Sequence, residues 1–233
     1  MQGSEHERLW AELQRRIGHR FAQPLLLRQA LTHRSYSSDN NERLEFLGDA
    51  LISAYVAERL YRLKPRAGEG DLSRLRASLV REGALAAMAR EVDLGPLLQL
   101  GEGELKSGGW RRDSVLADAL EALVAAVYLD AGGDAMRTVC ATVFNAALGN
   151  LPDAESLKDP KTQLQEWLQG RSRPLPQYEV LSESGPAHRR YFSVRARLTD
   201  ANVSAESSGS SRRVAEQQAA RLLLERLSGV STG

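Results

Sequence analysis

Apolar residues recur at helical spacing through the first two thirds of the chain. Leu9, Leu13 and Ile17 form one apolar edge, which predicts one or two helices over residues 6–31. The same period predicts further helices over 42–61, 71–92, 113–130 and 134–148, and no alternating strand pattern precedes residue 150. The first 150 residues are therefore expected to form an all-α domain.

The pattern changes after a segment rich in Asn, Pro and Asp. Residues 178–181, 191–198 and 202–207 alternate with period two, which predicts three strands. Helical patterns flank them at 160–169 and 211–227, giving an α-β-β-β-α unit large enough for a small domain. The predicted organisation is an all-α domain at 1–150, a linker at 151–157 and an α+β domain at 158–229.

Carboxylates interrupt the apolar surface of two of the predicted helices. Glu42, Glu45 and Asp49 are spaced i, i+3 and i+7, so they line one stripe of a helix whose other positions are mostly apolar. Asp118 and Glu121 are spaced i, i+3 in a second apolar helix. Like charges held beside a core repel one another and lose hydration, which calls for a compensating cation. We expect the two helices to face each other across a divalent metal ion.

A solvated acidic face, with Arg43 as its local partner, is the ordinary interpretation of such a stripe. It fits poorly here because one arginine stands against three acids and little polar surface surrounds them. A metal site built from carboxylate oxygens favours Mg²⁺ or Mn²⁺ over Zn²⁺.

Composition indicates an ordinary globular protein, with 42% hydrophobic and 26% charged residues. The single Cys140 excludes an internal disulfide framework and a cysteine-rich zinc site, and it is expected in the core. Residues 1–154 carry 19 Lys and Arg against 21 Asp and Glu, whereas residues 155–233 carry 12 against 9. That excess is too mild to indicate nucleic-acid binding by itself. No apolar run reaches transmembrane length and no secretory segment opens the chain, so a cytoplasmic protein without membrane association is expected.

Three other features leave two interpretations open. His33 suits a structural histidine near a helix end, and a metal ligand is the alternative. Glu69 suits either an acid favoured by a helix dipole or a further acid of the metal site. The glycine-rich segment 101–109 carries Lys106, as a phosphate cradle would, but it lacks a P-loop signature.

Several ordered motifs are similar to those of bacterial ribonuclease III. The stretch NERLEFLGDA at 41–50 resembles that family's signature. Further blocks match in the expected order, namely LTHRS at 31–35, EGDLS at 69–73, KSGG at 106–109 and ADALEAL at 117–123. The unit at 158–229 resembles the double-stranded RNA-binding domain that follows the nuclease domain in that family. The resemblance covers nearly the whole chain and implies both domains.

The resemblance implies an Mg²⁺-dependent endoribonuclease that cuts both strands of duplex RNA and leaves 5′-phosphate and 3′-hydroxyl ends. The metal-binding positions that it implies, with Mn²⁺ as a substitute ion, are Glu45, Asp118 and Glu121. The catalytic acids that it implies are Asp49, Glu121, Glu42 and Glu69, of which the first two matter most. Metal-assisted hydrolysis accounts for so many carboxylates. The implied roles are the processing of ribosomal RNA precursors and of some messenger and transfer RNA precursors.

In the C-terminal unit the resemblance implies RNA contacts from the first helix, from the turn between the first two strands and from the start of the last helix. These residues are Gln163, Gln165, Glu166, His188, Arg212 and Arg213. The family usually carries a lysine pair after a glycine-rich turn, where this chain has an arginine pair after a serine-rich turn. Arginine keeps the charge, so binding is expected to survive.

The family also implies a homodimer through the nuclease domain, with one site for each strand of the duplex. The apolar faces around Phe46 and Leu47 are candidates for the interface, and burial in the core of one copy is the alternative for each.

Two rival functions predict different sequences. A non-catalytic RNA-binding protein with the same fold predicts eroded carboxylates, but all six matched positions are acidic. A metal-dependent phosphohydrolase acting on nucleotides predicts His-Asp pairs and no RNA-binding unit, whereas the four histidines of this chain are scattered. The sequence therefore favours the nuclease.

Overall fold

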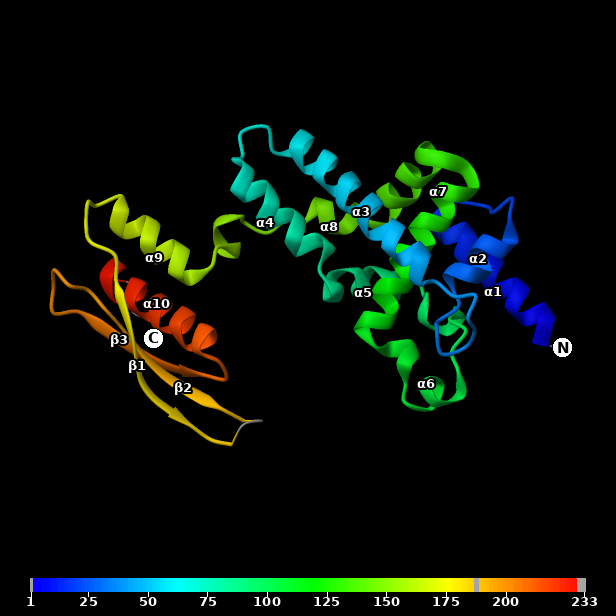
Figure 1. Ribbon diagram of the computed structural model, residues 1–233. Coiled ribbons are helices and arrows are strands. Elements are labelled where there is room, and N and C mark those ends of the chain that lie inside the picture. The colour runs from blue at the N-terminus through cyan, green and yellow to red at the C-terminus, as the bar shows by residue number, and fades with distance from the viewer. Residues whose placement is uncertain (1, 187–188, 230–233) are drawn as a thin grey trace. The chain divides into compact units, whose positions relative to one another are not determined.

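A computed structural model describes residues 2–186 and 189–229, with side chains from residue 8 onward. The chain divides into two compact units, residues 1–157 and 158–233. The first unit is helical and the second combines helices with a three-stranded sheet (Figure 1). The predicted fold class is therefore confirmed.

Two long helices form the centre of the first unit. Helix α3 (Glu42–Leu63) packs along α7 (Asp113–Val143), and α5 (Glu82–Glu91) and α2 (Pro24–Ala30) also pack on α7. The remaining elements are α1 (Gln2–Ile17), α4 (Glu69–Val80), η1 (Gly95–Leu97), α6 (Glu102–Lys106), η2 (Gly109–Arg111), α8 (Asn145–Gly149) and η3 (Glu155–Leu157).

The first half of α7 is the core of this unit because it is apolar on nearly every side. Leu116, Leu120 and Leu123 are each at most 1% exposed, as expected of a helix surrounded by other helices. Gly132 kinks α7 with a positive φ of 81°. The segment that the sequence predicts as a separate helix over 134–148 continues α7 to Val143 and then forms α8.

The helix predicted over 71–92 is in fact two helices. Arg81 has extended backbone angles, φ −67° and ψ 149°, and separates α4 from α5. Leu75, Leu79 and Leu85, on either side of this break, are all buried in one core. The apolar period therefore runs across the break and conceals it.

The second unit has an antiparallel sheet in the order β1 (Gln177–Ser184), β2 (Tyr191–Arg197), β3 (Ser204–Gly209). Helix α10 (Arg212–Ser228) packs on β2 and β3 and against α9 (Pro160–Gln169). Val194 and Ala196, which alternate along β2, are fully buried. This alternation places the small core on one face of the sheet.

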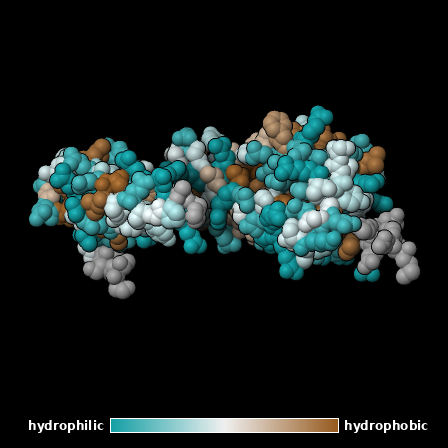
Figure 2. Space-filling view, turned by 60° about the horizontal axis from the view of Figure 1, so that its bottom comes forward, coloured by the Kyte–Doolittle hydropathy of each residue, from teal (hydrophilic) through white to brown (hydrophobic). Residues whose placement is uncertain are grey.

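Hydrophilic residues cover much of the surface, and hydrophobic residues are exposed in small groups (Figure 2). Phe46 on α3 is the most exposed large hydrophobic side chain among the described residues, at 81%. No described helix is both long enough and apolar enough to cross a membrane.

Candidate active site

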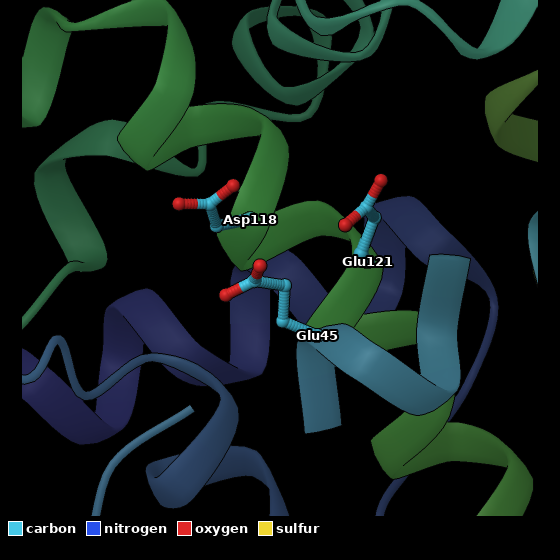
Figure 3. A group of neighbouring side chains, drawn as sticks. All are labelled: Glu45, Asp118 and Glu121. Atoms are coloured by element: carbon cyan, nitrogen blue, oxygen red, sulfur yellow. The ribbon is translucent and has the colours of Figure 1, made fainter. Parts of the chain in front are cut away.

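Three carboxylates from two helices meet in the first unit. Glu45 extends from α3, and Asp118 and Glu121 extend from α7 toward the same space (Figure 3). One oxygen from each lies within 4.8 Å of the others, and each residue is partly buried. The two acidic helices thus face each other, as their sequences predict.

The cluster is electrostatically unfavourable without a cation. Burial, followed by repulsion from Asp49, Asp118 and Glu45, raises the pKa of Glu121 to about 8. Burial also raises the pKa of Glu45, with further contributions from Asp118 and Glu42. Burial and repulsion from Glu82 raise the pKa of Asp118. Each carboxylate would be more readily ionised beside a bound cation.

The other three predicted acids lie outside this group of three. Asp49 is exposed on α3, close enough for its charge to raise the pKa of Glu121. Glu42 begins α3 and forms an ion pair of 3.4 Å with Arg34. Glu69 is the first residue of α4 and accepts a hydrogen bond of 2.7 Å from the Ser73 hydroxyl. Among the described residues, the acidic stripe therefore forms its ion pair with Arg34 and not with Arg43.

The loop before α3 is fixed to a distant segment of the chain. The backbone N–H of His33 donates to the carbonyl of Gln99 at 3.0 Å, and the N–H of Gly101 donates to the Ser35 hydroxyl at 2.9 Å. His33 Nδ1 lies 2.8 Å from the same hydroxyl. Buried Asn41 closes the loop, since its N–H donates to the Thr32 carbonyl at 2.9 Å. These contacts favour the structural interpretation of His33.

A cavity of about 500 Å³ adjoins the carboxylates. Glu42, Glu45 and Asp118 line it together with residues to which the sequence analysis gave no role. Arg34 and Arg112 bring positive charge to its wall, and Arg112 is paired with Glu104 at 2.7 Å. The charge of Glu82, the first residue of α5, raises the pKa of Asp118. Glu82, Glu104 and Arg112 had no periodic or motif signal, because their positions depend on how α5 and α6 pack. Arg34 lies within the motif at 31–35, but nothing in that motif marked it as a residue of the site.

The predicted RNA contacts of the second unit lie on its two helices. Gln163, Gln165 and Glu166 are on α9. Arg212 and Arg213 are the first residues of α10, where Ser211 caps the helix by accepting from the Val214 N–H at 3.2 Å. The predicted contact His188 lies outside the described residues.

Comparisons with known proteins agree with both halves of this description. A ribonuclease-III-like family model matches residues 23–147, and a double-stranded RNA binding motif model matches residues 160–227. Ribonuclease 3 of Xanthomonas oryzae pv. oryzae is 56% identical over 211 residues, which is 91% of this chain and 93% of that protein. Ribonuclease 3 of Alkalilimnicola ehrlichii is 54% identical over 215 residues, 92% of this chain and 94% of that protein.

Solved structures of the nuclease domain of ribonuclease III from Campylobacter jejuni resemble the first unit. One, which concerns flexibility in a region involved in that protein's dimer formation, is 40% identical with a TM-score of 0.57 and covers 58% of this chain and 95% of the other. A second is 38% identical with a TM-score of 0.58 and covers 61% and 97%. The chain belongs to the ribonuclease III family and is an endoribonuclease that cleaves double-stranded RNA.

Proposed function

We propose that Glu45, Asp118 and Glu121 bind Mg²⁺, for which Mn²⁺ can substitute, and that duplex RNA is hydrolysed at this group. One observation carries the proposal. Three carboxylates from α3 and α7 approach one another within 4.8 Å, and none of them forms an ion pair within the described ranges. Acids buried together in this way are stable as charged groups only beside a cation.

The residues fit such an ion. They offer oxygen ligands, which Mg²⁺ and Mn²⁺ prefer. Burial and mutual repulsion raise the pKa of each carboxyl group, and a divalent cation would offset both effects. When bound, the ion supplies Lewis-acid chemistry that lowers the pKa of water and stabilises negative charge on the phosphate and the leaving oxygen.

The other three acids contribute to catalysis beside the three metal-binding carboxylates. Asp49 acts with Glu121 as the pair on which catalysis depends most, and its charge already acts on Glu121. Glu42 supplies charge next to Glu45 and is held by Arg34. Glu69 belongs to the wider catalytic cleft as a further acid.

The second unit is proposed to hold the duplex through α9 and the start of α10. Gln163, Gln165 and Glu166 supply hydrogen-bonding groups, and Arg212 and Arg213 supply positive charge at a helix N-terminus, which suits phosphate. A-form RNA is recognised mainly by its shape and backbone. Specificity for the duplex would therefore come from the spacing of these contacts.

We also propose a homodimer through the nuclease domain. The strands of a duplex run antiparallel, so two copies related by a two-fold axis present one identical site to each strand. Phe46 on α3 is 81% exposed, which favours its interpretation as an interface residue over burial in its own core. Leu47, in contrast, packs against the core of its own unit. A region of dimer formation in the related nuclease domain from C. jejuni supports this assembly.

By family membership, the proposed substrates are ribosomal RNA precursors and some structured messenger and transfer RNA precursors, in the cytoplasm. Depletion of the protein should lead to accumulation of unprocessed ribosomal precursors, measured by hybridisation to their spacer sequences. Normal precursor levels after depletion would contradict this role.

Calorimetric titration of Mn²⁺ tests the metal site directly. Asp118→Asn keeps the shape of the side chain and removes a ligand charge, so it should weaken binding by at least about tenfold. Asp134→Asn makes the same change on the exposed part of α7 and is the matched control. Equal affinities in wild type and Asp118→Asn would refute the site.

A further inference from the structure

The carboxylate of Glu216 on α10 contacts two positively charged side chains. Its Oε1 accepts a hydrogen bond of 2.8 Å from Arg212 Nε, and its Oε2 accepts one of 2.7 Å from Lys161 Nζ. The Glu216 side chain is only 12% exposed. Burial alone would raise the pKa of Glu216, but the hydrogen bonds from Lys161 and Arg212 outweigh it and hold the pKa below its ordinary value. The carboxylate is therefore charged under neutral conditions.

The geometry at Arg212 leaves its binding groups free. Within the described part of the chain, Arg212 donates hydrogen bonds through Nε alone. Its two terminal nitrogens carry the N–H groups that form a planar fork suited to phosphate. The side chain is 64% exposed. Glu216 thus fixes the Arg212 guanidinium through Nε, and the two terminal nitrogens remain available to a phosphate.

The second cation connects Glu216 to the other helix. Lys161 lies in the first turn of α9, and its Nζ is 4.4 Å from the centroid of the Tyr178 ring. Asp159, which caps α9, also forms a hydrogen bond with Gln217 of α10. The starts of both helices are therefore tied together, and Glu216 is the group that contacts a basic residue on each.

We infer that Glu216 is a positioning residue for duplex RNA, which holds Arg212 and Lys161 in a fixed arrangement against the phosphate backbone. This inference rests on the proposed contact of Arg212 with RNA. Flexible arginine side chains lose rotamer freedom when they bind. A carboxylate that fixes the guanidinium beforehand reduces that loss, and it also sets the spacing between the cations of α9 and α10.

Neutralising Glu216 should change the affinity for RNA in opposite directions, depending on whether Glu216 repels phosphate or positions the basic side chains. An acid among basic residues on a phosphate-binding face should repel RNA, so neutralising it should tighten binding. If Glu216 positions Arg212 and Lys161, neutralising it should weaken binding although the protein becomes more basic.

The test is binding of the full-length protein to a labelled RNA duplex in EDTA, where binding is measured without cleavage. The variants are Glu216→Gln, Arg212→Gln, the double variant and Glu216→Asp, which keeps the charge but shortens the reach. Glu225→Gln is the matched control, because Glu225 pairs with Arg221 four residues earlier on the same helix. Thermal unfolding sets a temperature at which every variant is folded.

We expect Glu216→Gln and Glu216→Asp each to weaken binding by about tenfold, comparable to the loss of one charged hydrogen bond. Glu225→Gln should bind as wild type or slightly tighter. The salt dependence should also change: the slope of log K against log salt should fall by about 1 in Arg212→Gln and by a similar amount in Glu216→Gln. A purely structural role would leave that slope unchanged.

The double variant separates the failure of the inference from that of the RNA contact. If Glu216 acts through Arg212 and Lys161, the losses should not add: Glu216→Gln should weaken binding less in the Arg212→Gln background, where only the positioning of Lys161 remains to be lost, than in wild type. Weaker binding by Arg212→Gln together with unchanged or tighter binding by Glu216→Gln would overturn the inference and leave the RNA contact standing. If Arg212→Gln binds as wild type, the contact and the inference are both wrong.

Discussion

A Cβ atom on Gly48 would lie 1.9 Å from the carbonyl oxygen of Glu121. Gly48 is buried on α3, one turn after Glu45, and Glu121 is on α7. The two helix backbones therefore touch at the level of the acidic cluster, and only glycine permits this approach. The distance between Glu45 and the two acids of α7 is set at this contact.

Gly48→Ala should accordingly damage both stability and activity. The added methyl group has backbone atoms rather than a flexible side chain as its neighbours, so α3 and α7 must separate. We expect a loss of about 3 kcal/mol or more in the free energy of unfolding, together with loss of cleavage. Gly133→Ala is the control, because nothing lies within 4 Å of its added Cβ. Wild-type stability in Gly48→Ala would show that the helices are not in this contact.

Asp130 should contribute to stability from the opposite end of the first half of α7. Its carboxylate accepts from the backbone N–H groups of Ala22 and Gln23 at 3.0 and 2.8 Å and lies 2.9 Å from His19 Nε2. Asp130→Ala would leave these groups unpaired, at a cost of about 2–4 kcal/mol measured by urea unfolding at pH 7. Asp134→Ala, which removes an exposed acid from the same helix, should change little.

The stabilisation by Asp130 should also depend on pH. Burial alone would raise the pKa of Asp130, but the hydrogen bonds from Ala22, Gln23 and His19 outweigh it and lower the pKa. Because the folded state favours the ionised form, the stabilisation is present above about pH 4 and is lost as the pH falls further. The stability difference between wild type and Asp130→Ala should therefore shrink below pH 4. A difference that is constant from pH 7 to pH 3 would contradict this assignment.

Glu121 should have the reverse effect in the metal-free protein. The pKa of Glu121 is raised to about 8 in the folded state from an ordinary value of 4.5. The folded state thus holds a proton that the unfolded state has lost, so stability falls as the pH rises from about 4.5 to 8. At pH 8 in EDTA, Glu121→Gln should be more stable than wild type by roughly 1–2 kcal/mol, allowing for partial solvent exposure.

Metal should reverse that difference. Mg²⁺ should raise the melting temperature of wild type and do so much less in Glu121→Gln, because only the wild-type site has its full ligand charge. Parallel stability curves for the two proteins across pH 5–8, with and without Mg²⁺, would count against a buried, metal-compensated Glu121.

Phe46 tests the proposed dimer. Its side chain is 81% exposed on α3, so Phe46→Asp should not disturb the core of its own unit. We expect the variant to sediment as a monomer at concentrations where wild type is a dimer, because a charge in an apolar interface costs several kcal/mol. Tyr61→Asp, another exposed aromatic position on α3, is the control. A dimeric Phe46→Asp would exclude this face as the interface.

Much of the fold was predictable because it depends on local periodicity. The change from a helical period to alternation marks the second unit, and the apolar positions of α7 mark it as a core helix. The break at Arg81 was not predictable, since Leu75, Leu79 and Leu85 are buried in one core on both sides of it. A period reports which face is buried and not whether the backbone is continuous.

The candidate site shows the same limit. The spacing of the acids indicated that the two apolar helices would face each other, and the resemblance to the ribonuclease III family singled out Glu45, Asp118 and Glu121 among them. Contacts that depend on tertiary packing had no signal in the spacing of residues. Arg34 forms its ion pair with Glu42 from a loop, and the charge of Glu82 on α5 raises the pKa of Asp118. The role of Glu216 had no signal in the sequence because its two partners lie 4 and 55 residues away, on two different helices.

Cleavage of a labelled RNA duplex in Mg²⁺ by wild type, Glu121→Gln and the exposed control Glu91→Gln tests the central claim most directly. Wild type and Glu91→Gln should cut both strands, whereas Glu121→Gln should bind the duplex with unchanged affinity and cut it at least about a hundredfold more slowly. Cutting by Glu121→Gln at the wild-type rate would place the chemistry elsewhere and contradict the metal site formed by Glu45, Asp118 and Glu121.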